Sequence, residues 1–245
     1  MKIGILCAGD DELAPFLPQI KEMKMTEKAM LRFYEGKLGG ADVVALYSGV
    51  CKVNAAIATQ ILIDTFGVST VINAGTAGAI DEKLNLFDTV VATDCCYHDV
   101  ADDILTDFHP WMKTVFFESA PYLLEKEKLA VKKAELSNVF FGRMVTGEAF
   151  ITDEGREQIT RKFAPLSVDM ETAAVAHVCY QVTTAFFRLN DSPSDAPVYS
   201  STGLNPVFRP TLRALFSFAI HNNFFAVIEC VFPDSLHGKR NPHFG

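Results

Sequence analysis

Four short polar stretches follow predicted strands, and each holds a group that a polar ligand could use. They are "AGDDE" with Glu12, "GTAG" with Thr76 and free backbone N–H groups, "TGEAFI" with Phe150, and "DMET" with Glu171. In open α/β sheets, ligands bind beyond the carboxyl ends of the strands, where the loops leave the sheet. These four loops are therefore predicted to form one binding site.

Taken singly, each of these residues also has a structural interpretation. Glu12 and Glu171 stand at predicted helix starts, where carboxylates are favoured by capping and by the helix dipole. The glycines of 75–78 could form a strand-to-helix turn or admit a ligand close to the backbone. The stretch is neither G-x-G-x-x-G nor a P-loop, so a nucleotide cofactor is not indicated.

The apolar pattern predicts alternating strands and helices. An α/β protein with a central twisted, mixed sheet and helices on both faces is therefore expected, as a single domain over 1–245. The predicted strands are 2–6, 41–49, 71–74, 87–99, 138–146 and 165–170, and the predicted helices are 10–20, 51–66, 119–136, 153–163 and 171–182.

Composition excludes several classes of protein. Of 245 residues, 49% are apolar and 21% are charged, which is typical of a soluble globular chain. The net charge of -8 and the lack of a basic stripe argue against nucleic-acid partners. The one membrane-like stretch, 214–228, carries no charge but is too short to span a membrane, and a buried helix is expected there.

The six cysteines form no C-x-x-C pair, and the chain opens on "MKIGIL" without an apolar signal region. Reduced thiols in the cytoplasm are expected. Cys95 and Cys96 should point to opposite faces of a strand, so they cannot easily share a metal ion.

Six motifs in order, from "MKIGILCAGDDEL" through "SGVCKVNAA", "INAGTAG", "DTVVATDCCYHDV" and "VTGEAFI" to "VDMETAAVAHVC", carry a family resemblance. Over about residues 1 to 180 the chain resembles the 5′-methylthioadenosine/S-adenosylhomocysteine nucleosidases of the nucleoside phosphorylase superfamily. The resemblance implies the three-layer fold of that superfamily. It also implies hydrolysis of an N-ribosidic bond with release of adenine.

The resemblance gives the nominated residues roles. It implies that Glu12 is the general base that activates water, that Thr76 lies near that water, and that the backbone at Gly78 approaches the ligand. The remaining implied contacts are Phe150 stacked on adenine, main-chain hydrogen bonds from Ile151 to the base, and Met170 and Glu171 against the ribose.

The general acid of the family is an Asp in an "R-x-x-S-D" run, and here that region departs from the pattern. It reads "QVTTAFFRLNDSPSDAPVYSS", with a strand predicted only over 184–189. Asp195 keeps the Ser-Asp pair and is the preferred acid, while Asp191 is the alternative. Nine of the 20 Phe but four of the 30 acidic residues follow Val182, so the tail is atypical.

No metal or organic cofactor is implied, since no His/Cys/Asp cluster has ligand spacing. The resemblance implies a homodimer in which the neighbouring subunit helps to wall the pocket, and "DILTDFHPW" (103–111) is a candidate for that wall. Two alternatives stay open on the same fold. A nucleoside phosphorylase should supply arginines near the early loops, yet Arg32 is the only one before Arg143. A related hydrolase, such as futalosine hydrolase, would differ in the pocket beyond the sugar. A nucleoside-binding protein without turnover is the third alternative.

Overall fold

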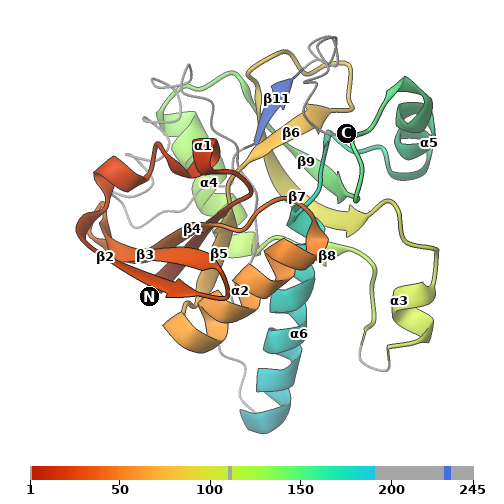
Figure 1. Ribbon diagram of the computed structural model, residues 1–245. Coiled ribbons are helices and arrows are strands. Elements are labelled where there is room, and N and C mark those ends of the chain that lie inside the picture. Colours follow the sequence, from red (N-terminus) through yellow and green to blue (C-terminus); the bar gives the residue numbers. More distant parts are fainter. Residues whose placement is uncertain (1, 110–111, 191–228, 233–245) are drawn as a thin grey trace, which may run out of the picture.

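The strands of the N-terminal half form a five-stranded sheet in a computed structural model, which describes residues 2–109, 112–190 and 229–232 (Figure 1). The strand order is β2-β3-β4-β1-β5, with β1 parallel to both β4 and β5. The bounds are β1 Lys2–Cys7, β2 Lys21–Lys28, β3 Leu31–Leu38, β4 Ala41–Tyr47 and β5 Thr70–Asn73.

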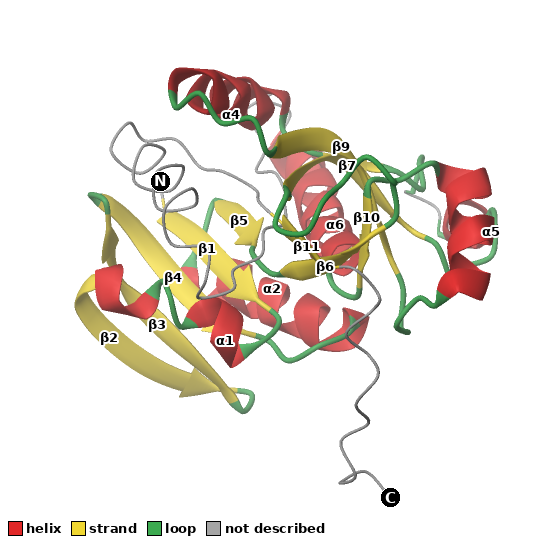
Figure 2. Cartoon of the chain, turned by 90° about the horizontal axis from the view of Figure 1, so that it is seen from above, coloured by secondary structure: helices red, strands yellow, loops and turns green. Residues whose placement is uncertain are grey.

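A second, six-stranded sheet begins only two residues after β5. Its order is β11-β6-β10-β9-β7-β8, and β11 also pairs with β7, so the sheet curves back on itself. The bounds are β6 Thr76–Ala79, β7 Thr89–Tyr97, β8 Phe117–Glu118, β9 Val139–Thr146, β10 Ser167–Asp169 and β11 Glu229–Phe232. The chain passes from one sheet to the other at Ala74 and Gly75, and Figure 2 shows the two sheets side by side.

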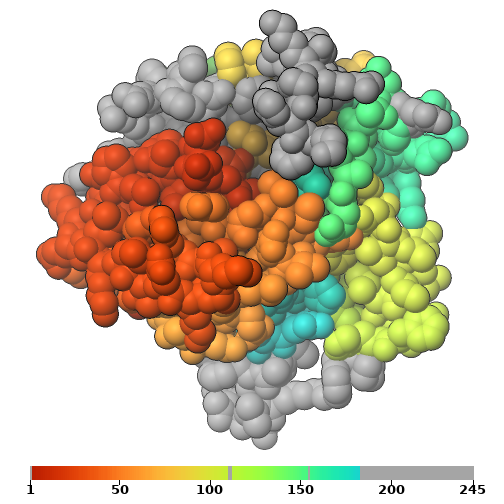
Figure 3. Space-filling view, viewed as in Figure 1, coloured from red at the N-terminus to blue at the C-terminus, as the bar shows by residue number. Residues whose placement is uncertain are grey.

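The helices are α1 Asp10–Leu13, the 3-10 turn η1 Leu17–Gln19, α2 Lys52–Phe66, α3 Ile104–Asp107, α4 Pro121–Lys133, α5 Asp153–Phe163 and α6 Thr172–Asn190. Helices α2 and α6 run beside each other (Figure 1). In Figure 3, α2 (orange) and the segment around α3 (yellow-green) lie on the same face of the molecule. No helix in the described part of the chain is long and apolar enough to cross a membrane.

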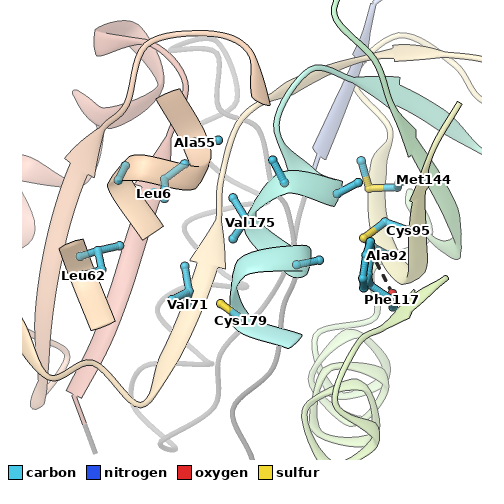
Figure 4. Packing of buried hydrophobic residues seen from close by; sticks show 14 of the residues in the cluster. Leu6, Ala55, Leu62, Val71, Ala92, Cys95, Phe117, Met144, Val175 and Cys179 are labelled. Carbon is cyan, nitrogen blue, oxygen red and sulfur yellow. Dashed lines mark hydrogen bonds between the residues drawn. The ribbon is translucent and has the colours of Figure 1, made fainter. Parts of the chain in front are cut away.

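Alternation along β1 explains why helices cover both faces of the first sheet. Ile3 and Ile5 point into one buried cluster with residues of α4, whereas Leu6 points into another with residues of α2. In Figure 4, Val175 and Cys179 of α6 lie between the side chains of α2 and those of β7, β8 and β9. The expected α/β class with flanking helices is confirmed.

Cys95 and Cys96 belong to different buried clusters, as expected for neighbours on a strand. Cys95 faces α6, and Cys96 faces α5. The five cysteines outside β11 and within the described residues are free thiols.

Several sequence predictions differ from the structure. The helix expected over 10–20 is divided into α1 and η1, because Pro15 and Pro18 cannot continue the hydrogen-bond ladder of a helix. In the "GTAG" stretch, Gly75 belongs to the junction between the sheets, and the residues from Thr76 to Gly78 belong to strand β6 and not to a turn into a helix. The β2–β3 hairpin was not predicted, since β2 is exposed along nearly its whole length and lacks apolar alternation.

The strand predicted over 184–189 is also wrong, because α6 continues through these positions to Asn190. The helix predicted over 214–228 and both candidate acids, Asp191 and Asp195, lie outside the described residues.

Candidate active site

The four nominated loops leave β1, β5, β9 and β10, and the structure joins the first two directly. Glu12 lies in α1, just after β1, and is 8% exposed. Its Oε1 accepts hydrogen bonds from Thr76 N at 2.7 Å and Thr76 Oγ1 at 2.9 Å. Its Oε2 accepts from Ala8 N at 2.8 Å and Gly9 N at 3.0 Å. The carboxylate is thus fixed by four donors from two loops.

Gly75 is required at the junction between the two sheets because its α-carbon faces this carboxylate. A Cβ at position 75 would lie 3.1 Å from Glu12 Oε1 and 3.2 Å from Oε2. That spacing is tighter than a methyl group accepts without displacing its neighbour. The glycine therefore lets the Thr76 amide reach Glu12.

Glu171 is a second buried carboxylate, 6% exposed, between β10 and α6. Its Oε1 accepts from Cys51 N at 2.7 Å, and its Oε2 accepts from Met170 N at 3.1 Å. Burial, and after it the charge of Asp169, raises the pKa of Glu171 to about 8. A carboxyl group with such a pKa is typical of functional sites.

A buried network that sequence reasoning missed supports Glu171. Thr146 Oγ1 donates to Asp169 Oδ1 at 2.5 Å, and Thr172 N donates to Asp169 Oδ2 at 2.9 Å. Ala173 N in turn donates to Thr146 Oγ1 at 2.9 Å. The network ties the end of β9 to the start of α6. An Asp three residues before Thr172 is a capping pattern that could have indicated it.

The residues assigned to the adenine lie on the loop after β9. The Phe150 side chain is 78% exposed, whereas Ile151 packs against the cluster formed with α5. Met170 is partly buried beside Glu171. None of these positions tests the implied contact with a base or a ribose, which stays a prediction.

Gly78 lies within β6 and pairs with Val168 of β10. A Cβ at position 78 would lie 3.3 Å from Val168 Cγ1, so packing between the strands accounts for the glycine here. The approach of a ligand to its backbone stays a prediction. The His177 ring stacks on Phe117, and its Nδ1 lies 3.2 Å from the Tyr97 hydroxyl.

Sequence reasoning also missed a charged cluster beside the site, formed by Lys52, Asp99 and Glu148. Lys52 Nζ lies 2.9 Å from both carboxylate oxygens of Asp99. Glu148 N donates to Asp99 Oδ2, and Lys52 N donates to Glu148 Oε1, each at 2.9 Å. All three residues lie in the motifs quoted above, but their pairing joins positions up to 96 residues apart. No sequence pattern indicates it.

The described residues hold no group of three or more His, Cys, Asp or Glu side chains placed to bind a metal ion.

Residues 2–189 match the model of the phosphorylase superfamily. The chain belongs to this superfamily. A 5′-methylthioadenosine/S-adenosylhomocysteine nucleosidase from Staphylococcus aureus is 36% identical over 190 residues, which are 75% of this chain and 82% of the relative.

Solved structures agree with the assignment to the phosphorylase superfamily. The S-adenosylhomocysteine nucleosidase of Streptococcus pyogenes has a TM-score of 0.73 and 27% identity, covering 91% of this chain and 97% of that one. The Colwellia psychrerythraea nucleosidase, solved with adenine, has a TM-score of 0.69 and 30% identity over 90% and 95% of the chains. A futalosine hydrolase of Helicobacter pylori, at 23% identity and TM-score 0.74 over 91% and 98%, shows the same fold.

Proposed function

We propose that this phosphorylase-superfamily chain is a hydrolase that cleaves the N-ribosidic bond of 5′-methylthioadenosine and S-adenosylhomocysteine. The products are adenine and the 5-thioribose compound. The observation that carries the proposal is the buried carboxylate of Glu12, which two loops hold with four donors. The named activity of the nucleosidase relatives supports the choice of substrate.

Glu12 acts as the general base toward water. A carboxylate offers about four lone-pair directions, and its four donors use all of them, so the water must take the place of one donor. Of these four, the Thr76 hydroxyl is the one that can rotate away, because the other three are backbone amides. Thr76 therefore guides the water while the amides keep the base in place.

Glu171 differs in that its two donors among the described residues, Cys51 N and Met170 N, leave lone pairs on both oxygens. This arrangement suits the two hydroxyls of a ribose, which a carboxylate can bind together. Departure of adenine leaves oxocarbenium-like charge on the sugar, which Glu171 stabilises in its ionised form. Because the pKa of Glu171 is about 8 in the unliganded protein, this contribution grows as the pH rises toward 8.

Adenine would stack on Phe150 and cover its largely exposed ring, with the main chain of Ile151 as hydrogen-bond partner. Met170 would pack against the ribose, and the backbone at Gly78 would approach the ligand. For the acid that protonates the leaving base we propose Asp195, with Asp191 as the alternative. No metal or organic cofactor takes part in this proposal.

We further propose a homodimer in the cytoplasm. Two observations support the homodimer. On one face of α2, the side chains of Val53 and Ile57 are 66% and 45% exposed. Phe108, in the segment 103–111 that is proposed to wall the partner's site, is 79% exposed. Exposed apolar residues on one face of a helix, such as Val53 and Ile57, are typical of interaction surfaces. Free thiols at the described cysteines outside β11 fit a reducing compartment.

The first experiment measures adenine release from 5′-methylthioadenosine and S-adenosylhomocysteine in phosphate-free buffer, and release of the free purine base from futalosine as a further substrate. We expect release by the wild type and a loss in kcat of about 10²-fold or more in Glu12→Gln, because a general base contributes on that order. Asp195→Asn and Asp191→Asn then identify the acid.

A folded wild type that releases adenine only after phosphate is added would be a phosphorylase. A wild type that binds adenine nucleosides but is silent with and without phosphate would be a binding protein. Either result contradicts the proposed hydrolysis.

A further inference from the structure

Three loops meet at Lys52, the first residue of α2. The ammonium group of Lys52 lies 2.9 Å from each Asp99 oxygen, and the two side chains are only 21% and 27% exposed. This ion pair is more shielded from water than the pairs at the surface, such as Lys37 with Asp42, at 47% and 60%. Shielded pairs of this geometry hold their partners more firmly than exposed ones.

Glu148 hydrogen-bonds to both members of the ion pair, so that Lys52, Asp99 and Glu148 form a closed group of contacts. Its backbone N–H donates to Asp99 Oδ2, while its side-chain Oε1 accepts from the backbone N–H of Lys52. Asp99 thus receives donors from two loops at once. Removing its carboxylate would leave both donors without this acceptor.

Two members of this hydrogen-bonded group, Lys52 and Glu148, are close in sequence to residues of the proposed site. On one side, the amide of Cys51, next to Lys52, donates to Glu171 Oε1. On the other side, Glu148 stands two residues before Phe150. The ring of His98, which precedes Asp99, lies so close to Gly147 that a methyl group there would overlap it. The loop after β9 is therefore held by two consecutive residues of the β7 loop.

Burial tends to raise the pKa of Asp99, but the hydrogen bonds from Lys52 and from the Glu148 amide outweigh it, and the net pKa is lowered. Asp99 is therefore charged at neutral pH, as its contact with the ammonium group requires.

We propose that Asp99 is a positioning residue, which with Lys52 fixes the loop of Phe150 relative to Glu171. It sets the spacing between the groups that hold the base and the group that holds the ribose. This inference rests on the proposed nucleosidase function, but its structural part can be tested without turnover.

The test compares Asp99→Ala and Lys52→Met with Lys52→Arg, which keeps the charge. The matched control is Asp102→Asn, three positions along the same loop, because Asp102 pairs with Lys162 at the surface, where the side chains are 71% and 46% exposed. The readouts are kcat and KM for 5′-methylthioadenosine, the inhibition constant of adenine, and hydrogen–deuterium exchange of residues 147–151 in the unliganded protein.

We expect Asp99→Ala and Lys52→Met to raise KM and the adenine inhibition constant about tenfold, with kcat changed less than about threefold, since one charge-assisted contact is lost. Lys52→Arg should restore KM to within about twofold, and Asp102→Asn should leave all values unchanged. Exchange in 147–151 should be faster in the first two variants.

Unchanged KM with unchanged exchange in folded Asp99→Ala would overturn the proposal. So would a lower melting temperature with unchanged KM, since that is the mark of a merely structural pair. If the wild type itself releases no adenine, the proposed function fails, and the exchange of residues 147–151 alone decides whether Asp99 fixes this loop.

Discussion

At the scale of residues, two buried glutamates in the same candidate site have different surroundings. Glu12 is surrounded by donors from two loops, whereas Glu171 lies beside Asp169 and, within the described residues, accepts from two amides. The difference fits the proposed roles: Glu12 is a base held in one position, and Glu171 is a carboxyl group that can still accept hydrogen bonds from substrate hydroxyls. Environment, and not residue type, assigns the two roles.

The raised pKa of Glu171 predicts a pH-dependent stability. A carboxyl group that binds its proton more tightly when folded contributes stability that is complete below its unfolded pKa and is lost as pH rises toward about 8. Glu171→Gln carries no such charge. The melting temperature of Glu171→Gln minus that of the wild type should therefore increase by on the order of 5 °C from pH 5 to pH 8.5. A constant difference measured by calorimetry across this range would contradict the prediction.

Gly75→Ala tests the close approach to Glu12. The added methyl group meets both oxygens of the carboxylate and must displace them. We expect kcat for adenine release to fall about tenfold, because small misplacements of a catalytic group are costly.

Gly9→Ala is the matched control for Gly75→Ala. Gly9 also donates to Glu12, but a Cβ there meets nothing within 4 Å and its φ is -117°. Its kcat should stay within about twofold of the wild type. Equal losses in the two variants would show that space beside the carboxylate is not the cause.

At the scale of elements, the start of α2 stores backbone strain at the site. Cys51 precedes the helix with φ 82° and ψ 159°, a conformation that side chains rarely adopt, and in it the Cys51 amide reaches Glu171. The geometry of the loop is thus maintained by its contacts with Glu171 and with Glu148.

Cys51→Gly should relieve this strain. We expect it to be about 1 kcal/mol more stable than Cys51→Ala, because glycine adopts this conformation freely and both variants lose the same thiol. Chemical denaturation of the two variants measures the difference. A Cys51→Ala protein as stable as Cys51→Gly would mean that the conformation costs little.

At the scale of the whole molecule, the junction of the two sheets creates the site. Residues on either side of Ala74 and Gly75 belong to different sheets, so Thr76 starts a new strand where it can contact Glu12. Helix α2, which exposes Val53 and Ile57, lies on the same side of the molecule as the segment around α3 (Figure 3).

If that face joins two copies, a charge placed on it should separate them. Val53→Asp is expected to sediment as a monomer where the wild type sediments as a dimer, because a buried unpaired carboxylate is costly at an interface. Met30→Asp, which replaces a fully exposed residue on the β2–β3 turn, is the control and should stay dimeric. A monomeric wild type would reject the proposed homodimer.

The sequence by itself determined the α/β class, the order of most elements and the nominated carboxylates, because apolar periodicity and helix-start chemistry are local properties. α5 was predicted with the observed bounds, 153–163. The exposed β2 strand and the end of α6 escaped prediction, since neither has a distinctive local pattern.

Only the tertiary structure decided which residues meet. Glu12 and Thr76 are 64 residues apart, Cys51 and Glu171 are 120 apart, and Lys52 and Asp99 are 47 apart. Such contacts depend on the strand order and on the crossing between the two sheets, which no single stretch of sequence encodes. The same holds for the pKa of Glu171, because burial and the nearby Asp169 charge exist only once β10 and α6 are packed in place.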